Sequence, residues 1–358
     1  MPRPVVLIGE SASKRADYFG KAASLLGVPF DIISWEEIAK GFDLGRLKGA
    51  AVKVDPPVFQ TARLSQMKGR LEAYQAALQY LAQASCAFLN PPWAICQMLD
   101  KRATNQRLTA HGIPVTEMFP EEIRSVGQLL DVMQEKRCYS VFVKPRYFSG
   151  AAGVAAFRLH PGNGRMRLYT SCRLSDGQLI NTKKLACQDQ RTEITMLLGQ
   201  LLSLGCVVER WHPKAELNGK SYDLRVVFQF GHIAHIVARQ SSGPVTNLHL
   251  NNQAVAFSRL GLKQGMLDVA TLLCKKACAA YDADPCSRGR DPRKEASHIV
   301  PGGVNMVGFD LLVEKHTGNL RIIEMNGQGD LIYQDIYGEN QIYREQVRAM
   351  KEFRWGEV

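Results

Sequence analysis

The sequence predicts an α/β (α+β) protein with two or three domains. Its 358 residues exceed the roughly 250–300 residues at which a single hydrophobic core stops growing. The first hundred residues alternate strand and helix patterns, which is typical of a layer built on a parallel sheet. Residues 222–327 contain pairs of apolar runs joined by glycine turns, which is typical of antiparallel hairpins.

The amino-terminal segment is expected to contain four strands and two helices. No G-x-G-x-x-G follows the first strand pattern, and this absence argues against a dinucleotide site there. The expected strands are 4–9, 29–35, 49–54 and 86–90, and the expected helices are 14–27 and 64–84.

The middle segment shifts to a mixed pattern. A helix at 100–112 is closed by Gly112 and Pro114, which are helix-stop signals. The expected elements that follow are a helix at 125–136, strands at 139–146 and 153–159, two further strand-like pieces, a helix at 191–205 and a strand at 206–211.

The carboxy-terminal segment is expected to be rich in hairpins. One hairpin spans 222–240 with its turn at Gly231, and another spans 307–327 with its turn around Gly318. Between them we expect a helix at 266–283 and a polar loop at 284–298.

The composition is that of a folded protein with a basic charge balance. Hydrophobic residues make up 46%, charged residues 22%, and the formal net charge is +11. Such an excess suits nucleic acid, an anionic membrane or a charged small ligand such as ATP. The densest basic group, 286–295, contains acids and lacks interleaved aromatics. We therefore expect a solvated loop there and disfavour nucleic acid as a partner.

The cysteines and apolar segments bear on the cellular compartment. Nine cysteines form no C-x-x-C pair, and the start of the chain lacks a secretory pattern. These features predict reduced thiols and a cytoplasmic location. Cys274 and Cys278 are expected to be small buried residues rather than metal ligands. No segment approaches the roughly 20 apolar residues of a membrane span.

Common phosphate and hydrolase motifs are absent. Gly219, Lys220 and Ser221 read G-K-S, but position 214 is lysine where a phosphate loop needs glycine, and a strand follows instead of a helix. The chain contains neither H-E-x-x-H nor G-x-S-x-G.

Three oxygen-bearing side chains near the carboxy-terminal end form a candidate metal site. Glu324 and Asn326 are two positions apart in a strand and so share a face, and Asp310 would lie nearly opposite Glu324 in the hairpin. Two carboxylates at about 4 Å repel by roughly 4 kcal/mol at an effective dielectric near 20. Mg²⁺ prefers such oxygen ligands. The alternative is an ordinary solvent-facing hairpin, which the apolar flanking residues disfavour.

A second candidate element is the segment 142–154. Lys144 lies among apolar strand residues and could hold a phosphate charge. The small residues that come after it could form a flap whose backbone N–H groups cover phosphates. Alone, this pattern is also common in ordinary hairpins.

A series of short motifs runs along the chain: N-P (90–91), D-K (100–101), V-K-P (143–145), V-V-E (207–209), D-L-R (223–225), an arginine at 239, G-F-D (308–310) and E-M-N (324–326). The order of these motifs resembles that of the ATP-grasp superfamily over residues 1–345. Within it, the chain is similar to carboxylate–amine ligases related to glutathione synthase and to the glutamate-adding ribosomal-protein ligases, or to an uncharacterised bacterial subfamily.

The resemblance implies an ATP-grasp fold with an N-terminal Rossmann-like pre-ATP-grasp domain. The implied domains are this amino-terminal domain (1–98), a central ATP-grasp lobe with the lysines and flap (99–208), and a carboxy-terminal lobe with the magnesium site (209–358).

The resemblance also implies roles for individual residues. Lys101 and Lys144 would contact nucleotide phosphates beneath a flap of Ser149, Gly150, Ala151, Ala152 and Gly153, and Glu209, Arg210 and Trp211 would form the hinge at adenine and ribose. Asp310, Glu324 and Asn326 would bind the metal, Arg225 and Arg239 would neutralise phosphoryl and carboxylate charge, and Asp223 and Asn247 would lie at the substrate.

Some assignments keep an alternative. Lys101 could be a surface residue at a helix start, and Trp211 an ordinary aromatic plug. Asp223 could orient Arg225 or touch substrate. The segment 241–252, which contains Asn247, and the ending N-G-Q-G-D (326–330) both depart from the common family pattern. Because these two places line the implied acceptor pocket, the resemblance does not identify the substrate.

The predicted activity is ATP-dependent carboxylate–amine ligation through an acyl phosphate, with release of ADP and phosphate. The cofactors are ATP and Mg²⁺, with Mn²⁺ as a substitute, and the partners are small-molecule or peptide carboxylates and amines. The alternatives are an ATP-grasp kinase acting on a small polyanion and a catalytically silent nucleotide-binding scaffold. The oligomeric state stays open, a homodimer included. Glu324→Gln or Arg239→Ala is expected to abolish ADP formation while the fold survives.

Overall fold

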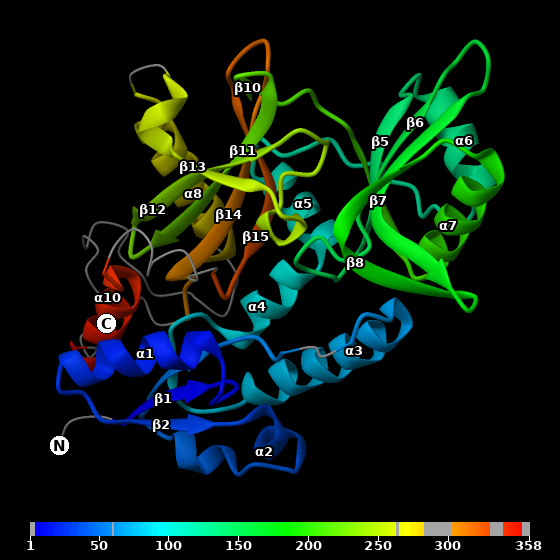
Figure 1. Ribbon diagram of the computed structural model, residues 1–358. Helices are drawn as coiled ribbons and strands as arrows, with labels where there is room; N and C mark the ends of the chain where they lie inside the picture. Colours follow the sequence, from blue (N-terminus) through cyan, green and yellow to red (C-terminus); the bar gives the residue numbers. More distant parts are fainter. Residues whose placement is uncertain (1–3, 59–60, 263–264, 283–301, 330–338, 353–358) are drawn as a thin grey trace.

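The computed structural model describes residues 4–58, 61–262, 265–282, 302–329 and 339–352. It contains three sheets, one parallel and two antiparallel, as the mixed α/β prediction requires. In Figure 1 the parallel sheet lies below the two antiparallel sheets. The basic loop expected at 284–298 lies outside the described residues.

The amino-terminal sheet is parallel, with the order β2-β1-β3-β4. Its strands are largely apolar and β1 is buried along its whole length, as expected when both faces of a parallel sheet are covered. The elements are β1 (Val5–Ile8), α1 (Lys14–Leu25), β2 (Phe30–Ile33), α2 (Trp35–Ala39), the 3₁₀ turn η1 (Leu44–Leu47), β3 (Ala51–Val54), α3 (Leu64–Leu81) and β4 (Ala87–Phe88).

Two helices differ from the sequence prediction. The strand expected at 29–35 ends at Ile33, because Ser34 caps α2: its hydroxyl accepts from the Glu37 N–H and the Glu37 carboxylate accepts from the Ser34 N–H. An unpredicted helix, α4 (Pro92–Leu99), precedes α5 (Lys101–Ala110). Proline is well tolerated at the first helical position, and Pro92 begins this helix.

The central sheet is antiparallel with the order β8-β7-β6-β5-β9, and two helices cover one face. Apolar side chains of both helices pack into the core of this lobe. The elements are α6 (Val126–Glu135), β5 (Ser140–Pro145), β6 (Ala155–Leu159), β7 (Met166–Ser175), β8 (Gln178–Gln188), α7 (Arg191–Ser203) and β9 (Cys206–Arg210).

The carboxy-terminal sheet is antiparallel with the order β13-β12-β11-β14-β15, and β10 pairs with β11. Helix α8 packs against it, and Cys274 and Cys278 are buried there as expected. The elements are β10 (Glu216–Leu217), β11 (Lys220–Gln229), β12 (His232–Ser241), η2 (Leu248–Leu250), β13 (Gln253–Ala256), η3 (Phe257–Leu260), α8 (Met266–Asp282), β14 (Met306–Val313) and β15 (Leu320–Asn326).

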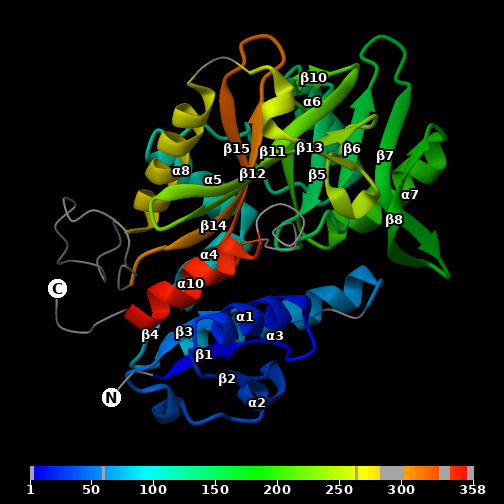
Figure 2. The ribbon, with the colours of Figure 1, turned by 60° about the vertical axis from the view of Figure 1, so that its left-hand side comes forward.

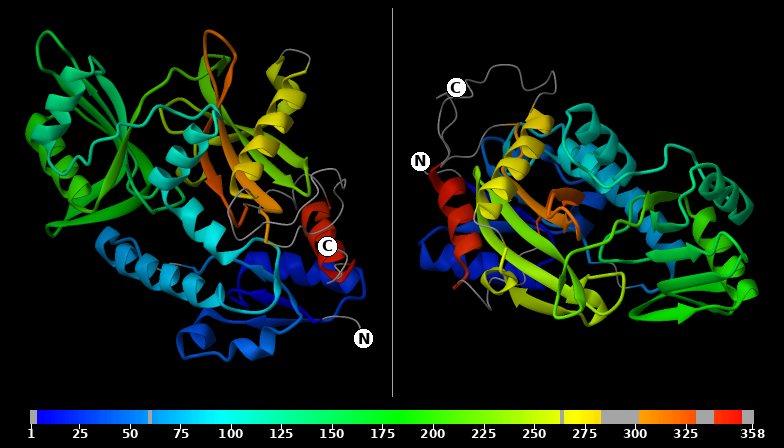
Figure 3. Two further views of the ribbon diagram at one scale, coloured as in Figure 1. Left: turned by 180° about the vertical axis from the view of Figure 1, so that it is seen from behind. Right: turned by 90° about the horizontal axis from the view of Figure 1, so that it is seen from above.

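The amino-terminal layer contacts both lobes. An unpredicted helix, α10 (Gln341–Glu352), lies beside α1 (Figure 2) and buries Tyr343 and Val347 in a core shared with Phe19. Helix α3 extends beneath the central sheet (Figure 3), where Arg63 forms a bridge with Ile180 of β8. Within the described ranges, no helix is both long and apolar enough to cross a membrane.

The expected division at 98/99 and 208/209 stays a proposal. Each proposed range contains most of one sheet, but position 208/209 falls inside β9, which pairs along its length with β5 of the central sheet. Glu209 and Arg210 are therefore held by the central sheet.

Candidate active site

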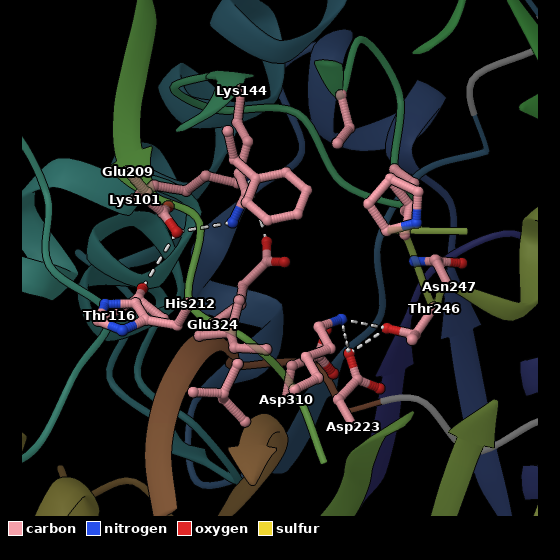
Figure 4. Close-up of a pocket in the computed structure, with 18 of the residues that line it drawn as sticks. Lys101, Thr116, Lys144, Glu209, His212, Asp223, Thr246, Asn247, Asp310 and Glu324 are labelled. Atoms are coloured by element: carbon pink, nitrogen blue, oxygen red, sulfur yellow. Dashed lines mark hydrogen bonds and ion pairs between the residues drawn. The ribbon is translucent and has the colours of Figure 1, made fainter. Parts of the chain in front are cut away.

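A pocket lies between the two antiparallel sheets (Figure 4). Phe142 and Lys144 of β5 and Glu209 of β9 line the central-sheet side. Asp310 of β14 and Glu324 of β15 line the other side. We call it the nucleotide pocket, because the candidate phosphate-binding lysines lie in it.

Lys144 is held by a buried carboxylate. Its Nζ lies 2.8 Å from Glu209 Oε2, and the Thr116 hydroxyl donates to the same oxygen at 3.0 Å. The Glu209 side chain is 3% exposed. Since Phe142 and Lys144 are two positions apart in β5, strand alternation directs both toward the pocket. Glu209 is therefore positioned to orient Lys144.

Lys101 reaches the pocket from the start of α5. Asp100 caps this helix by accepting from the Arg102 and Ala103 N–H groups. Lys101 Nζ donates to the Phe148 carbonyl and lies 3.2 Å from Glu324 Oε1, and its side chain is only 10% exposed. The alternative of a surface lysine is thus wrong.

The small-residue flap joins β5 to β6. Ala151 and Ala152 line the nucleotide pocket, while Ser149 and Gly150 line its neighbour. Gly153 has φ +72°, and a Cβ built on it would lie 2.6 Å from Pro145 Cγ. The flap can therefore approach β5 closely only with glycine at this position.

Gly153→Ala is expected to destabilise the central lobe by about 1–3 kcal/mol, since overpacking adds to the strain of the left-handed backbone. Gly177→Ala is the matched control, because Gly177 has a similar φ of +71° and no heavy atom within 4 Å of its built Cβ. Chemical denaturation of both variants measures the difference. Equal stability of the two variants would contradict this account of the flap.

The three candidate metal ligands lie together. β14 and β15 pair antiparallel with Asp310 opposite Glu324 and Asn326 opposite Gly308, so the expected register is confirmed. All three side chains line a second pocket, which shares Asp310 and Glu324 with the nucleotide pocket. Their carboxylate and amide oxygens are donors that suit Mg²⁺.

Two buried arginines surround Asp310. Arg225 lies opposite it in the sheet and donates to Oδ1, and Arg239 Nη2 lies 3.0 Å from Oδ2. Burial by itself would lower the pKa of Arg239, but the charges of Asp223 and Asp310 more than offset this and raise it above its usual range. Arg239 therefore stays charged beside the metal candidates.

Asp223 orients Arg239 and not Arg225, which corrects the expectation. The two are partners in the β11–β12 ladder, and Asp223 Oδ1 accepts from Arg239 Nε at 2.8 Å. Lys214 and Thr246 donate to its other oxygen. Burial would raise the pKa of Asp223, yet the charges of Arg239 and Lys214 hold it well below its usual range. Asp223 and Arg225 do share a face of β11, but Asp223 lies opposite Arg239 of the neighbouring strand β12 and pairs with it.

Of the residues expected at the hinge, Arg210 lines the nucleotide pocket and Trp211 does not. Arg210 pairs with Glu117 at 2.7 Å. Trp211 packs instead against Phe142, with the Arg158 guanidinium 4.0 Å over its ring. This packing is that of an aromatic plug, the alternative given for Trp211 above.

Some pocket residues were not predicted from sequence. Asn247 was predicted at the substrate, and it lines both pockets. Period-two alternation beyond Arg210 could have suggested His212 and Lys214, whereas Thr116 and Thr246 carry no local signal. The unpredicted polar residues are Thr116, His212, Lys214 and Thr246.

The ionic groups around the two pockets leave an excess of positive charge. This excess favours a polyanionic ligand such as a nucleotide triphosphate. The cations are Arg15, Lys101, Lys144, Arg210, Lys214, Arg225 and Arg239, and the anions are Glu209, Asp223, Asp310 and Glu324. Among the residues that the structure describes, no cluster of three or more His, Cys, Asp or Glu side chains suited to a metal is found. The proposed ligand set therefore depends on Asn326.

Comparison with known proteins finds similarity in structure alone. No family model matches the chain, and no curated protein matches it. It is similar to D-cycloserine synthetase DcsG, with 15% identity and a TM-score of 0.61, over 97% of this chain and 98% of that one.

Two further similar structures are peptide-bound. Macrocyclase MdnC from Microcystis aeruginosa MRC, bound with precursor peptide MdnA, shares 12% identity with a TM-score of 0.58, over 97% of this chain and 99% of that one. ATP-grasp ligase PsnB, complexed with minimal precursor, Mg and ADP, shares 12% identity with a TM-score of 0.56, over 98% of each chain. At these identities the likeness establishes the fold and leaves the reaction to the residues of the site.

Proposed function

Because this protein has the ATP-grasp fold over nearly its whole length, we propose that it is an ATP-dependent carboxylate–amine ligase. The observation that carries the proposal is the shared position of Asp310 and Glu324 between the two pockets. A phosphoryl group bound there can face both a nucleotide and an acceptor.

The nucleotide pocket would hold ATP. Lys101 and Lys144 offer point charges to the phosphates, and the backbone N–H groups of the flap can cover them. Adenine and ribose would contact the segment at Glu209 and Arg210. Lys101 Nζ and Glu324 Oε1 lie 3.2 Å apart. When this ion pair separates, Lys101 becomes available to a phosphate and Glu324 to a metal ion.

Asp310, Glu324 and Asn326 would hold Mg²⁺. When bound, the ion neutralises phosphate charge during the transfer. Asp310 is already bound by two guanidinium groups, so the arginines and the ion would share its carboxylate.

The reaction starts when a carboxylate oxygen of the substrate attacks the γ-phosphorus of ATP. The bond to the bridging oxygen of ADP breaks, and an acyl phosphate forms. An amine nitrogen then attacks the acyl carbon, phosphate leaves, and the nitrogen loses a proton. Arg225 and Arg239 would stabilise the charge on the transferred phosphoryl group, so no side-chain nucleophile is needed.

Several similar structures are consistent with this chemistry. They include a synthetase, macrocyclases and ligases, among them PsnB with Mg and ADP. MdnC and PsnB are bound to precursor peptides, which supports a peptide as one class of carboxylate or amine substrate for this protein.

The test is a screen of carboxylates and amines with ADP, phosphate and product measured together. A ligase releases ADP and free phosphate in equal amounts and yields a product of the condensed mass. A kinase would leave the phosphate on its product, and a silent scaffold would bind nucleotide with no ADP formed whatever acceptor is present. Either result would overturn the proposal.

A further inference from the structure

The second pocket has two chemically different sides. Its polar side presents Arg225, Arg239 and the three candidate metal ligands, which come from β11, β12, β14 and β15. The facing side comes from α3, α4 and the segment after β5. This apolar wall is formed by Leu71, Tyr74, Ile95, Met98, Tyr147 and Phe148.

Gly327 brings the apolar wall close to the reacting groups. A Cβ on Gly327 would lie 3.1 Å from Met98 Sδ and 3.4 Å from Ile95 Cα. The end of β15 therefore lies directly against α4. Glycine at this position sets the distance between the wall and Asn326.

The polar groups beside the wall are already bound. The Tyr74 hydroxyl accepts from Gln328 Nε2 at 2.5 Å. Arg15, the charged residue that the structure describes on this side of the pocket, donates to the Gln328 and Gly329 carbonyls at 2.8 Å each. A charged substituent packed on the six wall residues would lose its water there, whereas a hydrocarbon group gives up no hydrogen bond.

We propose that the carboxylate substrate carries an apolar or aromatic group, which packs on this wall while its carboxylate faces Arg239. The inference rests on the proposed ligase function and narrows its substrate class. Free hydrophobic amino acids and peptides that end in one share this chemistry. Acidic carboxylates, such as glutamate, do not.

The experiment uses hydroxylamine as a common amine, so that only the carboxylate varies. The carboxylates are leucine, phenylalanine, glutamate and lysine, each free and as the last residue of an alanine dipeptide. The apolar carboxylates are expected to give hydroxamate and ADP with kcat/KM at least about tenfold above the charged ones, since apolar contacts of this size discriminate by roughly 10- to 200-fold. The free and dipeptide arms tell which source is used.

The outcomes separate the two proposals. Ligation that favours glutamate or lysine would overturn the apolar substrate and keep the ligase. Failure of every carboxylate to form ADP and hydroxamate would overturn both.

Leu71→Lys tests the wall directly. It is expected to lower the leucine-to-glutamate ratio of kcat/KM by at least about tenfold, because the new ammonium would lie among the wall residues. Loss of folding would lower kcat/KM for leucine and for glutamate by the same factor. A change in their ratio therefore reports contact between the wall and the substrate's side chain. An unchanged ratio would overturn the proposal.

Two further variants complete the design. Leu267→Glu is the control, since Leu267 on α8 is 45% exposed and lies outside both pockets; its ratio should equal that of the wild type. Tyr147→Lys places the same charge at a half-buried position of the wall and repeats the test if Leu71→Lys does not fold. ADP affinity, measured by calorimetry, verifies the fold of each variant.

Discussion

Glu324→Gln is expected to lower the rate of ADP formation by about 10²- to 10³-fold while the fold is kept, the loss typical of removing one charge-stabilising group. The amide has nearly the same size but cannot supply the negative charge that a divalent ion requires. Glu324 is 24% exposed and pairs with Lys101 at 3.2 Å, so its neutralisation leaves no fully buried charge unpaired. Single-turnover ADP release measures the effect, and ADP affinity verifies the fold.

Glu216→Gln is the matched control for this variant. Glu216 pairs with Lys315 at 2.8 Å and is 40% exposed, away from both pockets. Its turnover should equal that of the wild type. Near-wild-type turnover in Glu324→Gln would contradict both the metal assignment and the ligase.

Arg239→Ala is expected to destabilise the protein by about 3–5 kcal/mol as well as to abolish ADP formation, because it removes one partner from buried ion pairs. Asp223 and Asp310, 2% and 6% exposed, both contact this guanidinium. The sequence prediction that the fold survives unharmed in this variant is therefore revised. Chemical denaturation followed by circular dichroism measures the stability.

Two further variants test the cause of this loss. Arg321 pairs with Glu314 at 2.5 Å, and the Arg321 side chain is 35% exposed. Arg321→Ala should therefore lower the free energy of unfolding by only about 0–1 kcal/mol. Adding Asp223→Asn to Arg239→Ala should lower the stability further, since the buried ammonium of Lys214, 3.1 Å from Asp223, would then lose its partner. If Arg239→Ala unfolds at the same denaturant concentration as the wild type, the buried pairing does not stabilise this sheet.

Local pattern was sufficient for the parts of the site formed by neighbouring segments. The turn near Gly318 sets the register of the hairpin as far as Leu311 opposite Ile322, and a one-residue bulge between Asp310 and Leu311 then brings Asp310 opposite Glu324. Alternation within β5 likewise directs Lys144 to the same face as Phe142. The parallel amino-terminal sheet followed from its alternating helix and strand patterns.

Local pattern failed where two signals competed. The apolar run ending at Trp35 looked like a strand, but the Ser34–Glu37 capping box begins α2. No helix was predicted over 92–99, although Pro92 occupies the first helical position. At α2 the capping box overrides the hydrophobic run, and at α4 the proline begins the helix without a side-chain cap.

By itself, the sequence predicted the chemistry that we propose for this chain: hairpin oxygens for a divalent ion, lysines for phosphate, and the order of segments typical of an ATP-grasp fold. Only the tertiary structure decided how these groups pair, since Asp223 meets Arg239 across a strand ladder and Trp211 packs against Phe142 without lining the pocket. It also placed the apolar wall of α3 and α4 against the end of β15. The physical reason is distance along the chain: hairpin register is set within a few residues, whereas packing between segments far apart in the sequence depends on the whole fold.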